Sequence, residues 1–400
     1  MIFTLEALRA KHGDCLLLHY GAADDPRFVL IDGGPAGVWQ ETLRPRLESL
    51  RRARRPGGTL EIPLVMVSHI DDDHVNGLLR LTRELVESRE DGERPPYRIG
   101  SLWHNGFDDL LGDRPDELLE PAAAAVIGPA GFAGLGPDLP AEVLRRHPGA
   151  LVLASVAQGR QLRLDAERLG LAVNAPGGTG GLLIAGGGEP VPFDDGLELT
   201  LIGPSRRRLR ELQEEWDEFL ERKRLGRVEP VEAAAFTDRS VFNLASVVVL
   251  ARTGEPDSAS MLLTGDARGD DVLEGLAAAG LLEDGSTLHV DLLKLPHHGS
   301  DRNVDTDFFR TVTADHYVLS GDGRHGNPEP ATFEMLLEAR RDDDLPYTLH
   351  LTYALEEMID DYPAEEVRGL LAREREGGRE FEVVTGGAGG RGVVVELGEE

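Results

Sequence analysis

Short apolar runs alternate along the chain with amphipathic stretches at helical spacing, which predicts alternating strands and helices. The run 63–67 predicts a buried strand, and apolar residues return at helical spacing over 75–85. Other runs of this kind predict further strands at 2–8, 15–19, 28–31, 97–103, 197–202, 247–250, 261–263, 288–293 and 316–319. This alternation predicts an α/β fold of layered sheets and helices.

Histidines and aspartates cluster directly after the strand predicted at 63–67. In extended chain alternate side chains point the same way, so His69, Asp71 and Asp73 can converge on one point. His74 then joins them from the first turn of the following helix. Four nitrogen and oxygen ligands from one strand-to-helix loop suit one or two divalent cations. The alternative interpretation is an acidic, capped loop at the protein surface.

Two later strand ends carry the same kinds of side chain. Asp266 follows the apolar run 261–263, and His297 and His298 follow the run 288–293. Three strand-end loops with ligand-type residues favour a metal site over a plain surface loop.

In their order along the chain these motifs resemble the metallo-β-lactamase superfamily. The motifs are His69-x-Asp71-x-Asp73-His74, then Gly265-Asp266, then the paired histidines followed by Gly299-Ser300. The branch that they resemble is the soluble hydrolase domain of the competence DNA-internalisation channel and its free-standing relatives. The resemblance implies a metal-dependent hydrolase with a four-layered αββα sandwich, here expected as a single domain over residues 1–400.

The resemblance also implies which side chains hold the metal. The implied ligands are His69, Asp71, Asp73, His74, Asp266 and one of His297 and His298. Asp266 would bridge two ions, zinc or manganese, and bound water would be the nucleophile. Asp73 or Asp71 would accept the proton of this water.

Three positions depart from the family pattern. Asp71 stands where the superfamily commonly has histidine, which favours harder ions such as manganese. The usual histidine before the hairpin is missing, since that region offers Asn243. The first ion site is therefore expected to be weak, to fill only with substrate, or to be completed by His104. The family's Gly-His-Pro-His reads Gly-Asn-Pro-Glu at 326–329, which leaves His325 as a candidate proton donor or phosphate contact. His104 and His325 can equally be ordinary hydrogen-bonded loop residues.

Asp14 and Asp32 lie in segments that support the metal site in the resembling family. Asp32 is expected to hold a ligand histidine through its free N–H, and Ser300 is a further supporting or substrate-contacting candidate. For Asp14 an ordinary turn role is an equal alternative.

The formal charge of −30 changes the substrate prediction. A strongly acidic surface repels long polyanions, so duplex DNA is disfavoured and a small phosphodiester or short nucleic-acid fragment is favoured. The chain shows no signal peptide and no apolar run near the ~20 residues of a membrane span, and it has one cysteine, Cys15. A cytoplasmic protein without a membrane partner is expected.

The composition shifts to alanine, glycine and proline over much of residues 108–192. This range is predicted to be an insertion that caps the active-site face.

Three functions stay open: a phosphodiesterase, a lactone, ester or thioester hydrolase of the same fold, and a catalytically weak metal-binding module. The sequence predicts neither the natural substrate nor the oligomeric state.

Overall fold

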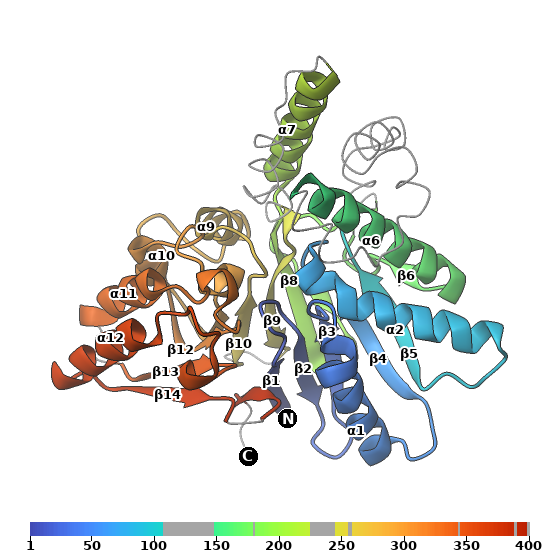
Figure 1. Cartoon of the computed structure of the whole chain (residues 1–400), viewed down its shortest axis with the longest axis horizontal. Coiled ribbons are helices and arrows are strands. Elements are labelled where there is room, and N and C mark those ends of the chain that lie inside the picture. The colour runs from blue at the N-terminus through green and yellow to red at the C-terminus, as the bar shows by residue number, and fades with distance from the viewer. Residues whose placement is uncertain are drawn as a thin grey trace.

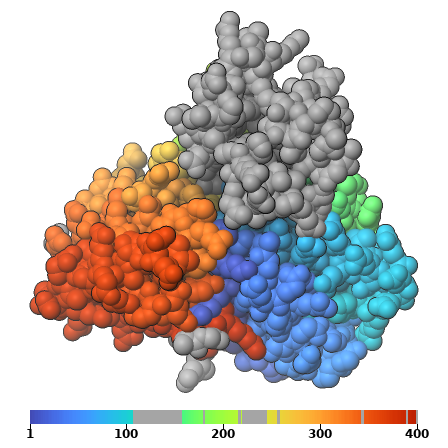
Figure 2. Space-filling view, in the orientation of Figure 1, coloured from blue at the N-terminus to red at the C-terminus, as the bar shows by residue number. Residues whose placement is uncertain are grey.

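The computed structural model describes residues 1–106, 148–178, 181–224, 245–254, 258–342, 345–387 and 390–397. Its framework is a pair of β-sheets, one of seven strands and one of eight. The N-terminal and C-terminal halves of the chain lie side by side, as Figure 2 shows for one face of the molecule. Each half therefore builds most of one sheet.

The first sheet has the strand order β15-β1-β2-β3-β4-β5-β6. Antiparallel pairing joins β15, β1, β2 and β3, and parallel pairing joins β3, β4, β5 and β6. The strands are β1 (Ile2–Leu8), β2 (Leu16–Gly21), β3 (Arg27–Ile31), β4 (Leu60–Met66), β5 (Tyr97–Trp103), β6 (Ala172–Val173) and β15 (Gly392–Glu396).

The second sheet has the order β14-β13-β12-β11-β10-β9-β8-β7. Strands β7 to β10 pair antiparallel, and β10 to β14 pair parallel. The strands are β7 (Val191–Pro192), β8 (Leu197–Gly203), β9 (Val248–Thr253), β10 (Ser260–Leu263), β11 (Leu288–Lys294), β12 (Val312–Leu319), β13 (Tyr347–Leu351) and β14 (Phe381–Thr385). The hairpin predicted at 247–250 and 261–263 is confirmed as β9 and β10.

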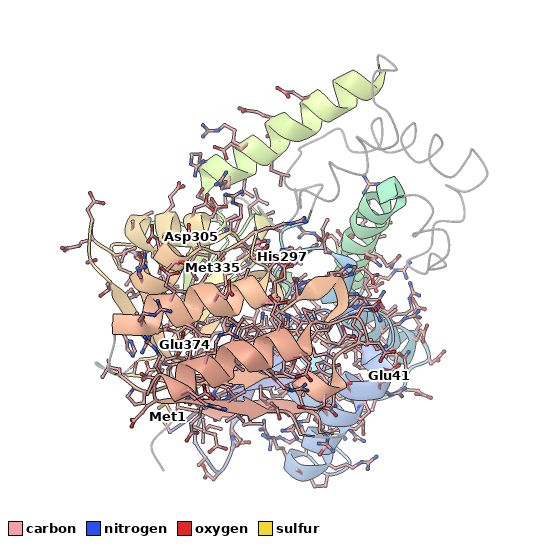
Figure 3. All side chains as sticks on the ribbon, turned by 60° about the vertical axis from the view of Figure 1, so that its left-hand side comes forward. Met1, Glu41, His297, Asp305, Met335 and Glu374 are labelled. Atoms are coloured by element: carbon pink, nitrogen blue, oxygen red, sulfur yellow. The ribbon has the colours of Figure 1, made fainter. Side chains whose placement is uncertain are left out.

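Helices cover the outer face of each sheet (Figure 1). The first sheet carries α1 (Arg44–Arg54), α2 (Asp72–Glu90) and α6 (Pro148–Leu169). The second carries α9 (Gly269–Ala278), α10 (Thr306–Thr311), α11 (Pro330–Ala339) and α12 (Ala364–Glu376). Met335 and Glu374 in Figure 3 mark two of these outer helices, α11 and α12. A further helix, α7 (Arg206–Arg224), projects from the layers.

Three apolar cores hold the layers together. One lies between the two sheets and includes Leu5, Leu18 and Leu263. The other two lie between each sheet and its helices and include Leu78 on one side and Phe308 on the other. Alternation along each strand sends successive side chains into different cores. The predicted α/β fold, a four-layered αββα sandwich, is confirmed.

Part of the predicted insertion at 108–192 contributes to these layers. Helix α6 lies along α2, where Thr82 Oγ1 donates to Asp165 Oδ2 at 3.1 Å, and β6 and β7 extend the two sheets. Residues 107–147 fall outside the described part, and the capping role stays a prediction. Among the described residues, no helix has the length and apolar character needed to cross a membrane.

Candidate metal centre

The topology brings several strand ends to one edge of the sandwich. β1, β3, β4 and β5 run in the same direction, so their carboxyl ends share one edge of the first sheet. In the second sheet β10, β11 and β12 are parallel and end together. Ligands bind preferentially in crevices outside the carboxyl ends of strands. Figure 3 shows His297 well away from Met1.

The segment that follows β4, residues 68–74, is here named the metal loop. Its helix begins earlier than the sequence analysis expected: α2 starts at Asp72, and Asp71 is its extended N-cap residue. Asp73 therefore lies in the first helical turn rather than in extended chain. The helix brings His74 and Asp73 toward the second sheet, while His69 reaches the same point from the strand side.

The other six predicted ligand side chains come together around Asp266, which is 2% exposed. Asp266 Oδ1 lies 3.3 Å from His74 Nε2 and 3.5 Å from His298 Nε2. Its other oxygen, Oδ2, lies 3.7 Å from His69 Nε2 and 3.4 Å from His297 Nε2. One carboxylate thus faces two sets of imidazoles, as a bridging ligand does.

The remaining two aspartates stand at the open side of each set. Asp71 Oδ2 is 3.4 Å from His69 Nε2, and its side chain is 31% exposed. The Asp73 oxygens lie 3.8 Å from His74 Nε2 and 3.7 Å from His298 Nε2. Ligands about 2.1 Å from one ion lie roughly 3.0–3.5 Å from each other, so these separations suit a cation between the atoms.

Two overlapping groups of ligand-type atoms each fit within 4.8 Å. They are Asp14, His74, Asp266 and His298, and His69, Asp73 and His74. The described residues therefore offer a centre for one or two cations at the place that the sequence predicts. The role of each residue as a metal ligand stays a prediction.

Several atoms in this cluster are buried without a hydrogen-bond partner among the described residues. They are His69 Nε2, His74 Nε2, His298 Nε2 and Asp266 Oδ1. Buried polar atoms are nearly always satisfied, because leaving one unpaired costs about 1–3 kcal/mol. Four such atoms that face one another fit a bound cation, since a cation satisfies all of them together.

The electrostatics of the cluster also favour positive charge. Burial lowers the pKa of His74 and His298, but Asp266 and other carboxylates raise it, to about 9 for His298 and well above the ordinary value for His74. Burial opposes ionisation of Asp266, yet the surrounding histidines, His74 first, hold its pKa well below the ordinary value. This pocket attracts cations.

His74 is held by the carboxylate predicted to support it. Its Nδ1–H donates to Asp32 Oδ2 at 2.8 Å, which leaves Nε2 as the ring nitrogen that faces Asp266. Asp32 also accepts the backbone N–H and the hydroxyl of Ser68, at 2.8 and 2.7 Å. Such a carboxylate fixes both the tautomer and the orientation of a ligand histidine.

His298 is backed by a buried ion pair. Asp14 Oδ1 lies 3.5 Å from His298 Nδ1, and Asp14 Oδ2 lies 2.9 Å from Lys294 Nζ, with both partners 1% exposed. Burial would raise the pKa of Asp14, but the Lys294 ammonium and His298 hold it well below the ordinary value. Ser320 Oγ lies 2.8 Å from the same ring nitrogen. Asp14 therefore lies at the site rather than in a remote turn.

The paired histidines occupy a tight turn, Pro296–Gly299, in left-handed backbone. His297 has φ 46° and His298 has φ 55°, a conformation that costs non-glycine residues of order 1–3 kcal/mol each. His297 Nδ1 lies 2.9 Å from Asn303 Oδ1, and Asn327 Nδ2 donates to the His297 carbonyl at 3.2 Å. The turn aims both imidazoles at Asp266, which sequence spacing alone does not reveal.

Three other predicted residues lie outside this cluster, and a fourth is not among the described residues. His104 is fully buried, next to Gly159 of α6, and belongs to neither group of possible ligands. Ser300 Oγ donates to Glu329 Oε2 at 3.2 Å. His325 is exposed and packs edge-on against His12, with ring centroids 5.6 Å apart. Asn243 lies outside the described residues. The functional roles proposed for these four stay predictions.

The sequence analysis overlooked several residues that contact the predicted ligands or their supports: Ser68, Lys294, Asn303, Ser320 and Glu329. Glu329 stands where the family pattern has histidine, and its carboxylate also accepts the Asp301 N–H at 2.7 Å. Lys294 carried a weak signal, because a lysine at the buried end of an apolar strand needs a partner. The other residues look like ordinary loop residues in the sequence.

Close backbone contact fixes the metal loop against the segment after β3. Gly33 N–H donates to the His74 carbonyl at 2.7 Å. A Cβ on Gly77 would lie 2.0 Å from the Gly33 carbonyl oxygen, so only glycine allows this approach. The contact sets the position of the first turn of α2, from which His74 projects.

Comparison with known proteins adds little to this picture. No family model matches the chain. Over 75 residues it is 40% identical to microtubule-associated protein 1A of Homo sapiens, Rattus norvegicus and Mus musculus, a match of 18% of this chain. The matched segment spans only 3% of the length of these relatives.

Two solved structures show a distant likeness. One is the subclass B3 metallo-β-lactamase MEM-A1 from a soil metagenome library, with 16% identity over 75% of this chain and 80% of that chain and a TM-score of 0.29. The other is a HARLDQ-motif mutant of a metallo-β-lactamase from Cronobacter sakazakii, with 13% identity over 94% and 91% and a TM-score of 0.27. Likenesses at such TM-scores carry no weight for function, so the conclusions below stand on the chain's own geometry.

Proposed function

We propose that this chain is a metal-dependent hydrolase whose substrate is a small or single-stranded phosphodiester. The observation that carries the proposal is the set of buried ligand-type atoms around Asp266 that face one another and have no hydrogen-bond partner in the described part of the chain. A bound cation would satisfy these atoms together, whereas polar atoms buried without a partner cost stability. Its nitrogen and carboxylate donors suit zinc or manganese.

We assign the ligands by the two oxygens of Asp266. On the Oδ1 side they are Asp73, His74 and His298. On the Oδ2 side they are His69, Asp71 and His297. In this assignment both paired histidines are ligands, and His297 supplies the third protein ligand that the missing histidine before the hairpin would have given.

When bound, a pair of divalent ions supplies charge that activates water and stabilises both the attacking and the leaving oxygens of a phosphoryl transfer. Asp71 is the most exposed of the three ligand carboxylates, at 31% against 24% for Asp73 and 3% for Asp266, which suits it to accept a proton from attacking water. Asp73 is the alternative acceptor. We assign to His325, which is exposed and packs edge-on against His12, the role of donating an imidazole N–H to a phosphate or leaving-group oxygen.

Burial lowers the pKa of His12 to about 4, so this ring is neutral at pH 7 and contributes hydrogen bonds rather than charge. With a net charge of −30 over the whole chain, long polyanions are repelled. A small phosphodiester or a short single strand presents less charge to this surface and is the substrate class that we favour.

The test uses the full chain, stripped of metal and reloaded with Mn²⁺ or Zn²⁺. Elemental analysis should find one or two ions per chain, and the loaded protein should cleave bis-p-nitrophenyl phosphate or short single strands. Asp266→Asn should lose both metal and activity. Asp291→Asn, which changes a carboxylate bonded to Ser260 in the second sheet, should keep both.

Other results would decide against the proposal. Turnover of p-nitrophenyl acetate, a lactone or a thioester, with none of the phosphodiester, would assign the same centre to carbonyl substrates. One ion per chain with no turnover on any of these substrates would make it a binding module. No bound ion in wild type would overturn the metal centre itself.

A further inference from the structure

Helix α6 contacts the metal loop through one buried amide. Gln158, which is 2% exposed, donates from Nε2 to Asp72 Oδ1 at 2.7 Å. The same oxygen accepts from Asn76 Nδ2 at 3.0 Å. Asp72 is the first residue of α2 and lies between the two predicted ligands Asp71 and Asp73. Gln158 thus reaches the turn that carries both of them.

Close packing accompanies this hydrogen bond. A Cβ added to Gly159 would lie 3.3 Å from Ile70 Cγ2 and 3.6 Å from His104 Cε1, so the helix backbone presses on the metal loop at the next residue. The other amide atom, Gln158 Oε1, is buried without a hydrogen-bond partner among the described residues. The hydrogen bond from Nε2 to the Asp72 carboxylate is of the charge-assisted kind.

We propose that Gln158 is a positioning residue of the metal centre, which acts through Asp72 to hold the ligand carboxylates of the metal loop in place. This inference rests on the proposed function and extends it, because it ties a helix within the predicted insertion to the chemistry. Gln158 itself touches neither ion nor substrate. Its role is to fix the turn from which Asp71 and Asp73 project.

The two predicted ion positions differ in how much they depend on this contact. On the Oδ1 side, His74 is held by Asp32 and His298 by Ser320 and Asp14. On the Oδ2 side, His69 Nδ1 lies 3.1 Å from Ser68 Oγ and His297 is held by Asn303. The difference lies in the carboxylates: Asp71 precedes the helix, makes no side-chain capping hydrogen bond there, and is more exposed than Asp73, at 31% against 24%. Loss of the Gln158 contact should therefore weaken chiefly the ion on the Oδ2 side.

The test measures metal affinity by isothermal titration of the metal-free full chain with Mn²⁺ or Zn²⁺. Gln158→Ala should bind the ion on the Oδ2 side about tenfold less tightly than wild type. This is the lower end of the 10–100-fold range for residues that orient ligands. The matched control is Gln161→Ala, one turn along α6, where Nε2 donates to Asp165 within the same helix. Gln161→Ala should bind both ions within about twofold of wild type. Its unfolding temperature should fall by about as much as that of Gln158→Ala.

Exchanging the hydrogen-bond donor and acceptor roles of residues 158 and 72 distinguishes a positioning role of Gln158 from simple packing. Gln158→Glu places a second carboxylate against Asp72 and should weaken metal binding at least as much as Gln158→Ala. Adding Asp72→Asn restores a donor and an acceptor across the contact, so the double variant should return to within about threefold of wild type. This rescue is not expected if Gln158 only fills space.

The inference is overturned if Gln158→Ala and Gln158→Glu bind both ions as tightly as wild type, or if Asp72→Asn fails to rescue Gln158→Glu. Equal losses in the alanine variants of Gln158 and Gln161 would also overturn it, because they would reflect general loosening of α6. If wild type itself binds no ion, the proposed function fails. If wild type binds and turns over normally while the Gln158 variants are unaffected, the positioning role alone fails.

Discussion

The support of His74 by Asp32 gives the sharpest test of the centre. Asp32 is 1% exposed and accepts three hydrogen bonds, from Ser68 N, Ser68 Oγ and His74 Nδ1, at 2.8, 2.7 and 2.8 Å. In Asp32→Asn one amide oxygen can still accept the Ser68 N–H. The amide NH₂ then faces two donors, which removes two charge-assisted hydrogen bonds worth about 1.5–3 kcal/mol each.

His74 can relieve part of this conflict by changing its tautomer. The Nδ1 lone pair then accepts from the new amide, and the proton moves to Nε2, the atom that faces Asp266. A protonated Nε2 cannot bind a cation. Asp32→Asn should therefore lower the affinity for the ion on the Oδ1 side by about 100-fold, which corresponds to about 2.7 kcal/mol.

The assay is isothermal titration of metal-free protein, with elemental analysis of the dialysed product. Asp291→Asn is the matched control, because Asp291 Oδ2 also accepts a backbone N–H and a hydroxyl, both from Ser260, at 2.8 and 3.0 Å. This variant should lose some stability but keep wild-type metal affinity. Metal binding by Asp32→Asn within about twofold of wild type would refute the tautomer reasoning.

Three further predictions concern packing and pH. Gly13→Ala should weaken metal binding in a titration, because the new Cβ would lie 1.9 Å from a backbone oxygen of the metal loop. Gly186→Ala is the control, since its new Cβ would have its nearest atom at 3.7 Å and should leave metal binding unchanged. Equal effects of the two variants would contradict the importance of this close contact. Burial raises the pKa of Glu6, but hydrogen bonds from its histidine and arginine partners hold it below 4.5, so its contribution to stability is present above about pH 4.5 and lost as pH falls through the lowered pKa. Urea unfolding should therefore show wild type losing more stability between about pH 6 and pH 3 than Glu6→Gln, and parallel losses would disprove it. Leu5→Ala, at a 0% exposed position between the sheets, should lower the free energy of unfolding by about 2–5 kcal/mol in the same assay. Leu164→Ala, at a 49% exposed position, should lower it by less than about 1 kcal/mol. Similar losses in the two variants would be inconsistent with the inter-sheet core.

Local patterns in the sequence determined the elements and the chemical character of the centre. Apolar runs of strand length predicted β4, β10 and β11, because a strand buried on both faces is apolar throughout. Ligand-type residues directly after each run predicted a metal site, since few other roles place imidazoles and carboxylates together at strand ends. The support of a ligand by Asp32 was expected from the resemblance, and its hydrogen bond to His74 is present.

Only the tertiary structure decided how these side chains face one another. The backbone turn at 296–299 aims both His297 and His298 at Asp266, and no spacing rule predicts two successive left-handed histidines. Lys294 and Gln158 belong to a distant strand and a distant helix, so their partners Asp14 and Asp72 became apparent only when the layers packed. The physical reason is range: propensity and periodicity act over a few residues, whereas orientation of a ligand depends on contacts between segments far apart in the chain.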